Sequence, residues 1–500
     1  MSRFLSHSTV ISRLAWAVLV CVLLVRIALV LFMGITPQDA YYHMYARSPD
    51  WSYFDHPPMV AYMLMPLRFL LGDSVFAIKA SDFIVTAATL VLIYHLAKNF
   101  YAGVQAFMLT CALGVSLMFT LCATNTTPDI PLLFFWTFSM LLAYKALTGG
   151  GHLLWALTGL AMAFAFDSKY TGLMLPAGFV LFLILSQPHR KFLFSSRMLC
   201  FILFFLIGVF PVFWWNYQHG WPSFLFQTVD RVKQLNGPIL KPQLFLGTLL
   251  TQIAILSPFL LYAIWRFGFQ KIWAFLKHRL SPDQDELFLL AFSLPILFFF
   301  TGVSFFSWVK INWMYPAYIG GTILVFRVLP EYFLKGHFWF SGIVNLLMAL
   351  EIFGYVVPVR SDDTWVGWEE LSHKVDQISD STDADFIFSM DSYKTSAVLG
   401  FYLKSKPVYA SNVLNKNALQ FSILNSDVCL ENGKNALFID SEPDLRKKYH
   451  TEKTDSTLSR WFEEVTTLEP VMVYSPSGTL LRRFQVFWCQ TYHCSGIPKE

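Results

Sequence analysis

Acidic and aromatic residues crowd the stretch that follows the first long apolar run of the chain. This stretch begins with Gln38-Asp39-Ala40-Tyr41-Tyr42 and continues to Ser52-Tyr53-Phe54-Asp55-His56-Pro57-Pro58. Carboxylates are costly to keep near hydrocarbon, and at the rim of a bilayer they are seldom present for packing alone. Asp39, Asp55 and His56 therefore predict chemistry at the boundary between lipid and water.

Two further polar residues stand at the ends of later apolar runs. Asp129 closes the motif Thr126-Thr127-Pro128-Asp129 and could act as a general base, orient another acid, or hold a divalent metal as a hard oxygen ligand. The alternative is that it caps the helix that begins at Pro131. Lys169 is a candidate clamp for a phosphate group, but it could also snorkel to the interface or pair with Asp167.

His56 is held in extended backbone by Pro57, which fixes its direction. It could contact a substrate or serve only as a scaffold, and Asp55 could simply orient it. The candidate substrate-binding residues beside these are Tyr42, Tyr53, Tyr170 and Lys310.

The composition requires lipid as the solvent for most of the chain. Charged residues make up 14% of the 500 residues and hydrophobic residues 55%, against roughly 25% charged residues in a typical soluble domain. The formal net charge of +4 is too small to indicate a nucleic-acid partner.

The apolar runs predict about eleven transmembrane helices, because roughly 20 apolar residues cross a hydrocarbon core of about 30 Å. The first run is too long for the apolar part of a signal peptide and is expected to be an uncleaved signal anchor. The runs lie near residues 14–35, 75–97, 102–122, 130–147, 152–167, 171–187, 198–216, 244–265, 286–305, 312–328 and 338–358. A span at 14–35 places Asp39 just beyond the membrane.

Lys and Arg are concentrated in alternate loops, for example at Lys98, Lys145, Lys191 and Arg266. The positive-inside rule then predicts a cytoplasmic N-terminus. In this orientation every polar cluster described above faces outward, which in a bacterial inner membrane is the periplasmic side.

The composition changes after Pro358, where the apolar runs end. Short stretches with strand character lie at residues 385–390, 407–410, 436–439 and 484–488. We therefore expect a transmembrane domain over residues 1–358 and a small periplasmic α/β domain over residues 359–500. Cys489 and Cys494 could form a disulfide there or stay unpaired.

Five motifs in this order resemble a known family. They are the first outward segment with its Asp-His-Pro-Pro, the Thr-Pro-Asp at 127–129, Ser-Lys-Tyr-Thr-Gly at 168–172, Asn-Tyr-Gln-His-Gly-Trp-Pro at 216–222 and Lys-Ile-Asn-Trp at 310–313. Residues 10 to 325 look like bacterial membrane glycosyltransferases of the protein-O-mannosyltransferase superfamily. Within this superfamily the chain is similar to the lipid A galacturonosyltransferases, and it resembles the lipid A aminoarabinose transferases more distantly.

The resemblance implies a mainly α, polytopic GT-C fold and a sugar donor carried on a polyprenyl phosphate. It also implies that Asp39 is the catalytic acid of the first segment, Asp129 a second acid and Lys169 the basic residue near the donor phosphate. Gln38-Asp39 stands where many relatives have two adjacent acids, and Asp55-His56 where the aminoarabinose branch has Glu-Lys. The first departure leaves open which position Asp39 occupies.

Three classes of function follow from these observations. The favoured one is an inverting glycosyltransferase that modifies lipid A, a glycan or a protein of the cell envelope. The alternatives are a transporter or flippase of a lipid-linked sugar, whose binding groups should lie near the bilayer midplane, and a non-catalytic subunit that binds polyprenyl phosphate. The sequence indicates no certain cofactor, although the carboxylates could bind a divalent metal.

Overall fold

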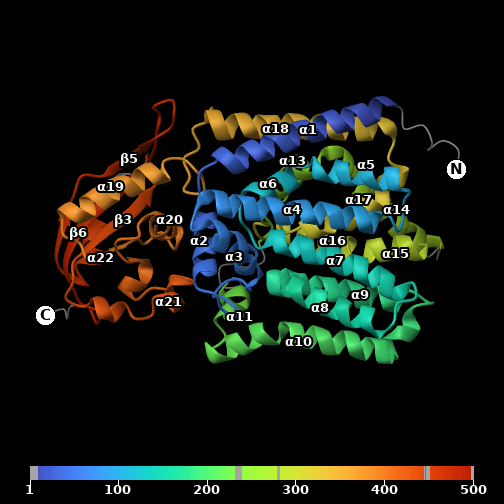
Figure 1. Cartoon of the computed structure of the whole chain (residues 1–500), viewed down its shortest axis with the longest axis horizontal. Helices are drawn as coiled ribbons and strands as arrows, with labels where there is room; N and C mark the ends of the chain where they lie inside the picture. The colour runs from blue at the N-terminus through green and yellow to red at the C-terminus, as the bar shows by residue number, and fades with distance from the viewer. Residues whose placement is uncertain (1–8, 231–238, 279–281, 444, 446–450, 497–500) are drawn as a thin grey trace. The chain divides into compact units, whose positions relative to one another are not determined.

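A computed structural model of the chain describes residues 9–230, 239–278, 282–443, 445 and 451–496 (Figure 1). The chain divides into two compact units. The first comprises Met1–Leu31, His56–Met63 and Lys79–Ala349, and the second comprises Phe32–Asp55, Leu64–Ile78 and Leu350–Glu500. Asp129 and Lys169 thus belong to the first unit, whereas the segment with Asp39 and Asp55 packs with the C-terminal residues. The predicted division at residue 358 stays a prediction.

The first unit is built of apolar helices, because a backbone in hydrocarbon must satisfy its polar groups within the helix. The long helices are α1 (Thr9–Phe32), α4 (Val75–Ala97), α7 (Asp129–Leu147), α8 (His152–Ser168), α10 (Ser196–Gln218), α13 (Pro242–Leu256), α14 (Pro258–His278) and α18 (Glu331–Gly354). Shorter ones are α5 (Gly103–Gly114), α6 (Leu117–Thr124), α9 (Met174–Leu185), α11 (Pro222–Leu225), α15 (Gln284–Ala291), α16 (Leu294–Ser304) and α17 (Tyr315–Val325). Single 3-10 or π turns lie at η1 (Tyr170–Leu173), η2 (Arg190–Phe194), η3 (Phe226–Asp230) and η4 (Phe326–Val328).

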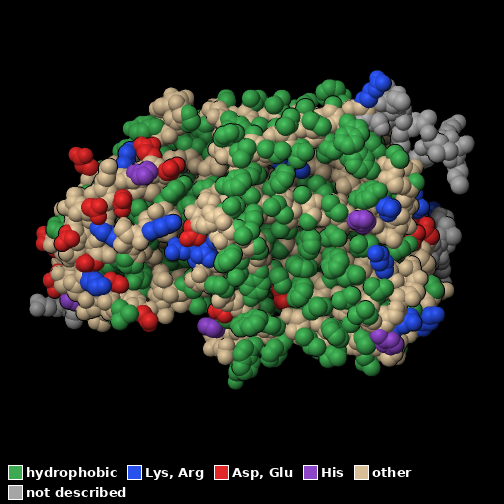
Figure 2. All heavy atoms as spheres, in the orientation of Figure 1, with side chains coloured by type: hydrophobic (Ala, Val, Ile, Leu, Met, Phe, Trp, Pro, Cys, Tyr) green, Lys and Arg blue, Asp and Glu red, His purple; other side chains and the backbone are tan. Residues whose placement is uncertain are grey.

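Among the described residues, six helical segments are long and apolar enough to cross a bilayer, and two bent helix pairs raise this to as many as eight. All eleven predicted runs fall on helices. Several of these helices, including α8 and α9, are shorter than a full span, so the count of eleven stays a prediction. Hydrophobic side chains cover the visible face of these helices in Figure 2, as expected for a multi-pass membrane protein.

The predicted run at 244–265 is not one straight helix but two, α13 and α14, which meet at 112°. Pro258 lacks the N–H that would continue the helix, and Ser257 takes a φ of 89°. The hydroxyl of Ser257 lies 2.8 Å from Nδ1 of the buried His337, and Nε2 of His337 lies 2.7 Å from the carbonyl oxygen of Ala112. A neighbouring helix thus stabilises the break, as helix interruptions in membranes require.

The helices α5 and α6 meet at 66°, and buried polar side chains bind the carbonyl groups freed at this break. Arg26 donates to the carbonyl oxygen of Gly114 at 2.5 Å and to the hydroxyl of Thr120 at 2.9 Å. Asn345 donates to the carbonyl oxygen of Val115 at 2.9 Å. The buried charge of Arg26 is therefore solvated by this helix break.

The second unit combines two N-terminal segments with a small sheet. Helix α2 (Pro37–Arg47) and the end of α3 (Met59–Leu71) join α19 (Trp368–Ser381), α20 (Lys394–Tyr402), α21 (Phe421–Leu424), α22 (Thr451–Leu458) and the turns η5 (Ser411–Leu414) and η6 (Val428–Glu431). The strands are β1 (Phe386–Phe388), β2 (Val408–Tyr409), β3 (Ala436–Glu442), β4 (Phe462–Thr467), β5 (Val471–Tyr474) and β6 (Leu480–Tyr492).

The sheet runs in the order β2-β1-β3-β6-β4, and β5 pairs with β6. Strand β1 is parallel to β2 and β3, whereas β6 is antiparallel to its neighbours. The four predicted strand regions are confirmed as β1, β2, β3 and β6, and β4 and β5 were missed. The predicted α/β character of the C-terminal residues is therefore correct.

The disulfide of this unit joins Cys429 to Cys494, with 5.1 Å between their Cα atoms. The sequence left open whether Cys489 and Cys494 pair or stay free; the structure pairs Cys494 with Cys429 and leaves Cys489 as a free thiol. Cys489 is fully buried in β6, opposite Ala436 of β3 and Val465 of β4. Its side chain therefore packs in the core as a small hydrophobic group, while Cys494 lies beyond the strand end.

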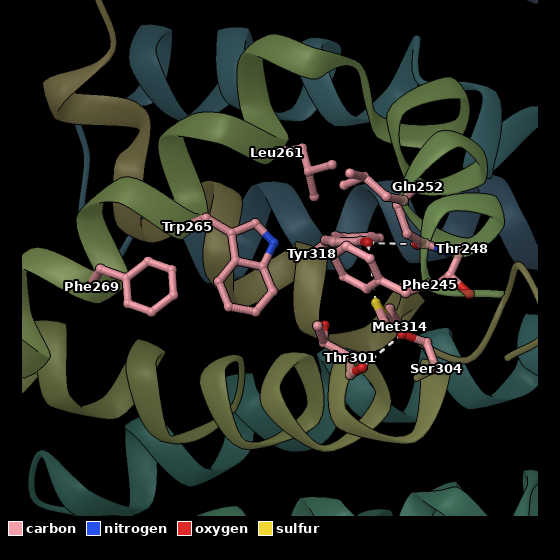
Figure 3. Close-up of a pocket in the computed structure, with 11 residues that line it drawn as sticks. Phe245, Thr248, Gln252, Leu261, Trp265, Phe269, Thr301, Ser304, Met314 and Tyr318 are labelled. Atoms are coloured by element: carbon pink, nitrogen blue, oxygen red, sulfur yellow. Dashed lines mark hydrogen bonds between the residues drawn. The ribbon is translucent and has the colours of Figure 1, made fainter. Parts of the chain in front are cut away.

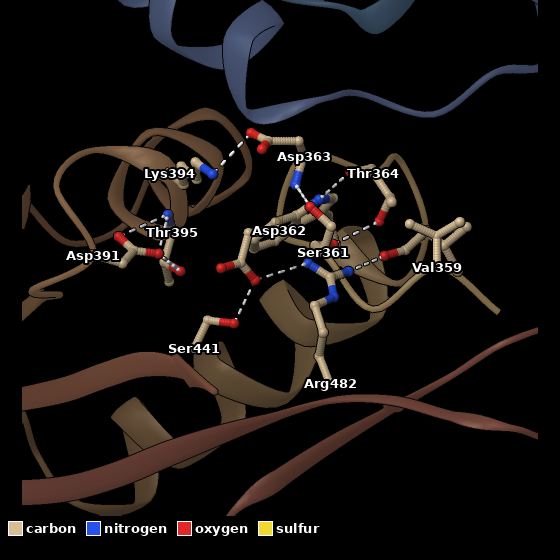
Figure 4. A network of polar contacts seen from close by, with 12 residues as sticks. Val359, Ser361, Asp362, Asp363, Thr364, Asp391, Lys394, Thr395, Ser441 and Arg482 are labelled. Atoms are coloured by element: carbon tan, nitrogen blue, oxygen red, sulfur yellow. Dashed lines mark hydrogen bonds and ion pairs between the residues drawn. The ribbon is translucent and has the colours of Figure 1, made fainter. Parts of the chain in front are cut away.

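A buried arginine fixes the segment between α18 and α19 onto the sheet (Figure 4). The guanidinium of Arg482 lies 4.2 Å from the centroid of the Trp368 ring and donates to the carbonyl oxygen of Val366. Asp362 lies 3.9 Å from it and accepts a hydrogen bond from Ser441. Burial lowers the pKa of Arg482 to about 10, so it stays charged at neutral pH.

Candidate functional site

The first unit, which contains the apolar helices, places a lysine, an aspartate and an asparagine together. Nζ of Lys169 lies 2.8 Å from Oδ1 and 2.9 Å from Oδ2 of Asp129. The side-chain amide of Asn312 donates to Oδ2 of Asp129 at 2.5 Å. Asp129 is 1% exposed and Lys169 7% exposed, so the group is nearly closed to solvent.

Two helix ends and one turn position these side chains. Asp129 is the first residue of α7, Lys169 follows the last residue of α8, and Asn312 lies in the turn ahead of α17. Helix ends leave backbone groups unpaired and are where polar residues in a membrane protein find partners. The cluster therefore forms where two helix ends and one turn, distant in sequence, come together.

The structure decides two alternatives that the sequence left open. Asp129 does not cap its helix: Pro128 holds the N-cap position, and no side-chain cap bond is present there. Lys169 pairs with Asp129 rather than with Asp167. Both carboxylate oxygens of Asp129 accept hydrogen bonds from the ammonium of Lys169, and Oδ2 also accepts one from Asn312, so Asp129 holds Lys169 in place.

Asp39, in contrast, is a capping residue. Its Oδ2 accepts from the backbone N–H of Thr36 at 2.8 Å, and its own N–H donates to the hydroxyl of Thr36 at 3.3 Å. This reciprocal capping box begins α2. Asp39 is fully buried, and the cap fixes the direction of its carboxylate.

The carboxylate of Asp55 accepts hydrogen bonds from two tyrosine hydroxyl groups of α2. Tyr41 donates to its Oδ1 at 2.9 Å, and Tyr45 donates to the same atom. Tyr53 stacks on Tyr45 with 4.0 Å between ring centroids, and its hydroxyl donates to the carbonyl oxygen of Tyr45 at 2.9 Å. The edge of Tyr42 meets both Tyr41 and Tyr45. The predicted residues Asp55 and Tyr53, from the segment after α2, thus form one buried cluster with the α2 tyrosines, which include the predicted Tyr42.

The other predicted residues belong to the first unit. His56 is half-buried and directly precedes the two prolines ahead of α3. Tyr170 packs against Phe166 and Phe224 with ring centroids 5.5 and 5.4 Å away. Lys310 is exposed and stands two residues before Asn312. Asn312 was part of a recognised motif but was not predicted as a site residue.

A pocket of about 270 Å³ lies beside the segment that supplies Asn312 (Figure 3). The rings of Phe245, Trp265 and Phe269 line much of it. At its polar side, Tyr318 donates to Oε1 of Gln252 at 2.5 Å, and Nε2 of Gln252 lies 3.3 Å from the carbonyl oxygen of Ile311. Met314, which also lines the pocket, follows Asn312 of the Asp129 cluster by two residues.

In the part of the chain that the structure describes, no group of three or more His, Cys, Asp or Glu side chains could hold a metal ion. Participation of a divalent metal stays a prediction.

Comparison with known proteins adds three findings. Residues 55–215 match the family described as dolichyl-phosphate-mannose-protein mannosyltransferase. The lipid A galacturonosyltransferase RgtD of Rhizobium johnstonii is 25% identical over 363 residues, which cover 70% of this chain and 74% of that protein.

The third finding concerns the fold. Two crystal structures of ArnT from Cupriavidus metallidurans, one in the apo state and one bound to undecaprenyl phosphate, superpose with TM-scores of 0.61 and 0.62. Each alignment covers 94% of this chain and 97% of ArnT, at 15% and 13% identity. The GT-C fold expected from the motifs is therefore confirmed. Together with the matched family and the curated relative, this fold identifies the chain as a membrane glycosyltransferase that resembles the lipid A galacturonosyltransferases of the protein-O-mannosyltransferase superfamily.

Proposed function

We propose that this protein transfers a sugar from a polyprenyl-phosphate donor to a hydroxyl group of lipid A, at the periplasmic face of a bacterial inner membrane. The observation that carries the proposal is the buried cluster of Asp129, Lys169 and Asn312 in a helical unit that shares the fold of ArnT. The ArnT structure bound to undecaprenyl phosphate supports the donor class. The name of RgtD supports lipid A as the acceptor.

The cluster suits the phosphate of such a donor. A lysine held by a carboxylate offers a fixed ammonium, and a charge fixed in advance stabilises the developing phosphate anion without reorganisation. Lys169 can turn one N–H toward a phosphate oxygen while Asp129 holds the others. The neighbouring apolar pocket suits a lipid chain of a substrate.

The reaction joins the acceptor oxygen to the anomeric carbon of the sugar. As this bond forms, the bond from the anomeric carbon to the phosphate oxygen breaks, and the polyprenyl phosphate leaves with the electron pair. A general base takes the proton of the acceptor hydroxyl. We assign this base to Asp39, as the motif resemblance implies, and expect attack from the opposite face with inversion.

The competing functions make different predictions. A flippase would move the donor across the bilayer without consuming it, and a binding subunit would retain polyprenyl phosphate without transfer. The polar cluster at helix ends and the similarity to enzymes favour transfer over both.

The test is a transfer assay in proteoliposomes with a radiolabelled polyprenyl-phosphate sugar and lipid A. We expect label in lipid A with the wild-type chain and none with Asp39→Asn. Galacturonic acid and aminoarabinose donors are compared in the same assay. Donor that changes leaflet without transfer would support the flippase, and bound donor with no transfer would support the subunit.

A further inference from the structure

Gln420, from the C-terminal part of the second unit, contacts the backbone of the first acidic segment. Its Oε1 accepts from the N–H of Phe54 at 2.7 Å. The main-chain N–H of Gln420 donates to the hydroxyl of Tyr41 at 3.2 Å. Gln420 is 1% exposed, so both hydrogen bonds form away from water, where a lost partner is costly.

These two bonds lead to Asp55. The hydroxyl of Tyr41 receives the N–H of Gln420 and donates to Oδ1 of Asp55. Burial, followed by the charge of Asp55, raises the pKa of Tyr41 well above its usual value, so the hydroxyl keeps its proton for this bond. Phe54, the second contact of Gln420, directly precedes Asp55. Gln420 therefore fixes Asp55 through the main chain and through a tyrosine hydroxyl.

Tyr393 holds the same tyrosine from a second side. Its ring lies 4.4 Å from that of Tyr41, centroid to centroid. Its hydroxyl also shares a hydrogen bond with the side chain of Gln38, the neighbour of Asp39. The loop ahead of α20 thus contacts α2 next to Gln38 and Tyr41, the residues that adjoin Asp39 and bind Asp55.

We propose that Gln420 and Tyr393 are positioning residues, by which the C-terminal part of the chain sets the geometry of Asp39 and Asp55 for sugar transfer. The inference rests on the proposed function and deepens it. It assigns to the C-terminal residues an indirect part in catalysis, through the placement of Asp39 and Asp55, since catalytic groups displaced by about 1 Å can lose about 10²-fold in rate.

The test replaces Gln420 by Met, which has a similar size but lacks the oxygen acceptor. The matched control is Gln377→Met, because Gln377 is an exposed glutamine on α19 of the same unit. Hydrogen exchange of the Phe54 amide is measured by mass spectrometry of overlapping peptides, together with kcat and KM for the donor. We expect Gln420→Met to speed this exchange about fivefold, as loss of one hydrogen bond allows, and to lower kcat about tenfold with KM within twofold. Gln377→Met should change neither.

A second variant covers the case in which Gln420→Met does not fold. Tyr393→Phe keeps the ring on Tyr41 and removes only the hydroxyl, and it should lower kcat with little change in thermal stability. Faster exchange with unchanged kcat in Gln420→Met, or an unchanged kcat in Tyr393→Phe, would overturn the inference while the proposed function stands. A wild-type chain with no transfer activity would refute the proposed function itself.

Discussion

The ammonium group of Lys169 lies within 2.9 Å of both carboxylate oxygens of Asp129, although 40 positions separate the two residues in the chain. Both side chains are buried. A buried ion pair is retained only when each charge is well solvated by its partner, because the desolvation of either ion alone costs several kcal/mol. The pair should therefore contribute to the free energy of unfolding, and this contribution can be measured separately from its proposed role in catalysis.

We expect Lys169→Met and Asp129→Asn each to lower the free energy of unfolding by about 3–5 kcal/mol, because each leaves one buried charge without its partner. The double variant should recover most of that loss and remain inactive. Thermal unfolding in detergent measures the stability, and the transfer assay measures the activity.

The matched control for this cycle is Lys335→Met, which removes the exposed pair of Lys335 with Glu331 at 2.8 Å. Exposed pairs contribute about 0–1 kcal/mol, so this variant should unfold almost as the wild type does. A double variant no more stable than the two single variants would contradict the buried pair.

Asp39→Asn should abolish transfer with little loss of stability. The side-chain oxygen of Asn can still accept the N–H of Thr36, so the capping box at α2 persists, whereas an amide cannot take a proton from the acceptor. Loss of a general base typically costs roughly 10² to 10⁴ in rate. Turnover within about tenfold of the wild type would remove Asp39 from the catalytic role.

The companion variant is Thr36→Ala, which removes the hydroxyl of the cap and keeps the carboxylate of Asp39. Loss of such a cap costs about 1 kcal/mol. It should lower the thermal stability of the protein more than Asp39→Asn does, which separates the capping function of this site from its chemistry.

The disulfide of Cys429 and Cys494 should stabilise the second unit by about 4 kcal/mol, because it closes a long loop in the unfolded chain. Reduction or Cys494→Ser should remove this stabilisation, and Cys489→Ala should leave the disulfide intact. Mass analysis after alkylation without reduction shows whether Cys489 is the free thiol and Cys494 the disulfide-bonded cysteine.

The same disulfide bears on the orientation of the chain, since disulfides persist in oxidising compartments. We expect alkaline phosphatase fused after residue 500 to be active and green fluorescent protein at the same place to be dark. The opposite pattern, with free thiols in cells, would place the C-terminal residues in the cytoplasm.

His43 should make the second unit sensitive to acid. Burial lowers the pKa of His43 to about 4. The negative charge of Asp73 opposes this shift, whereas the positive charges of Arg68 and Arg47 add to it. The unfolded chain, with a pKa near 6.5, binds more protons between these values. Stability is therefore full above about pH 6.5 and is lost as the pH falls toward 4.

His43→Gln should flatten this loss, because an amide can still meet Oδ1 of Asp73, now 3.0 Å from Nε2 of His43, without titrating. Thermal unfolding of both proteins between pH 4 and 7 measures the difference. Parallel profiles for the two proteins would show that other groups cause the acid sensitivity.

Asp39, Asp129 and Lys169 could be named from the sequence as candidate residues, and their roles stay predictions. Reading the sequence was enough to recognise the membrane class, the helical runs and four of the strands. These inferences succeed because hydropathy and residue spacing are local: an apolar run of about 20 residues must be a helix in lipid, and a charge at its end stands out. The order of motifs added the GT-C fold. The breaks at Ser257 and between α5 and α6 were missed, because a run of apolar residues does not reveal whether its helix is interrupted.

Which side chains meet could be learned only from the folded chain. Asn312 reaches Asp129 across 183 positions, and Gln420 reaches Phe54 across 366. Cys494 pairs with Cys429 rather than with the nearer Cys489, because β6 turns Cys489 into the core between β3 and β4. Such contacts depend on how distant elements pack, and no local pattern of residues encodes the partner that packing will supply.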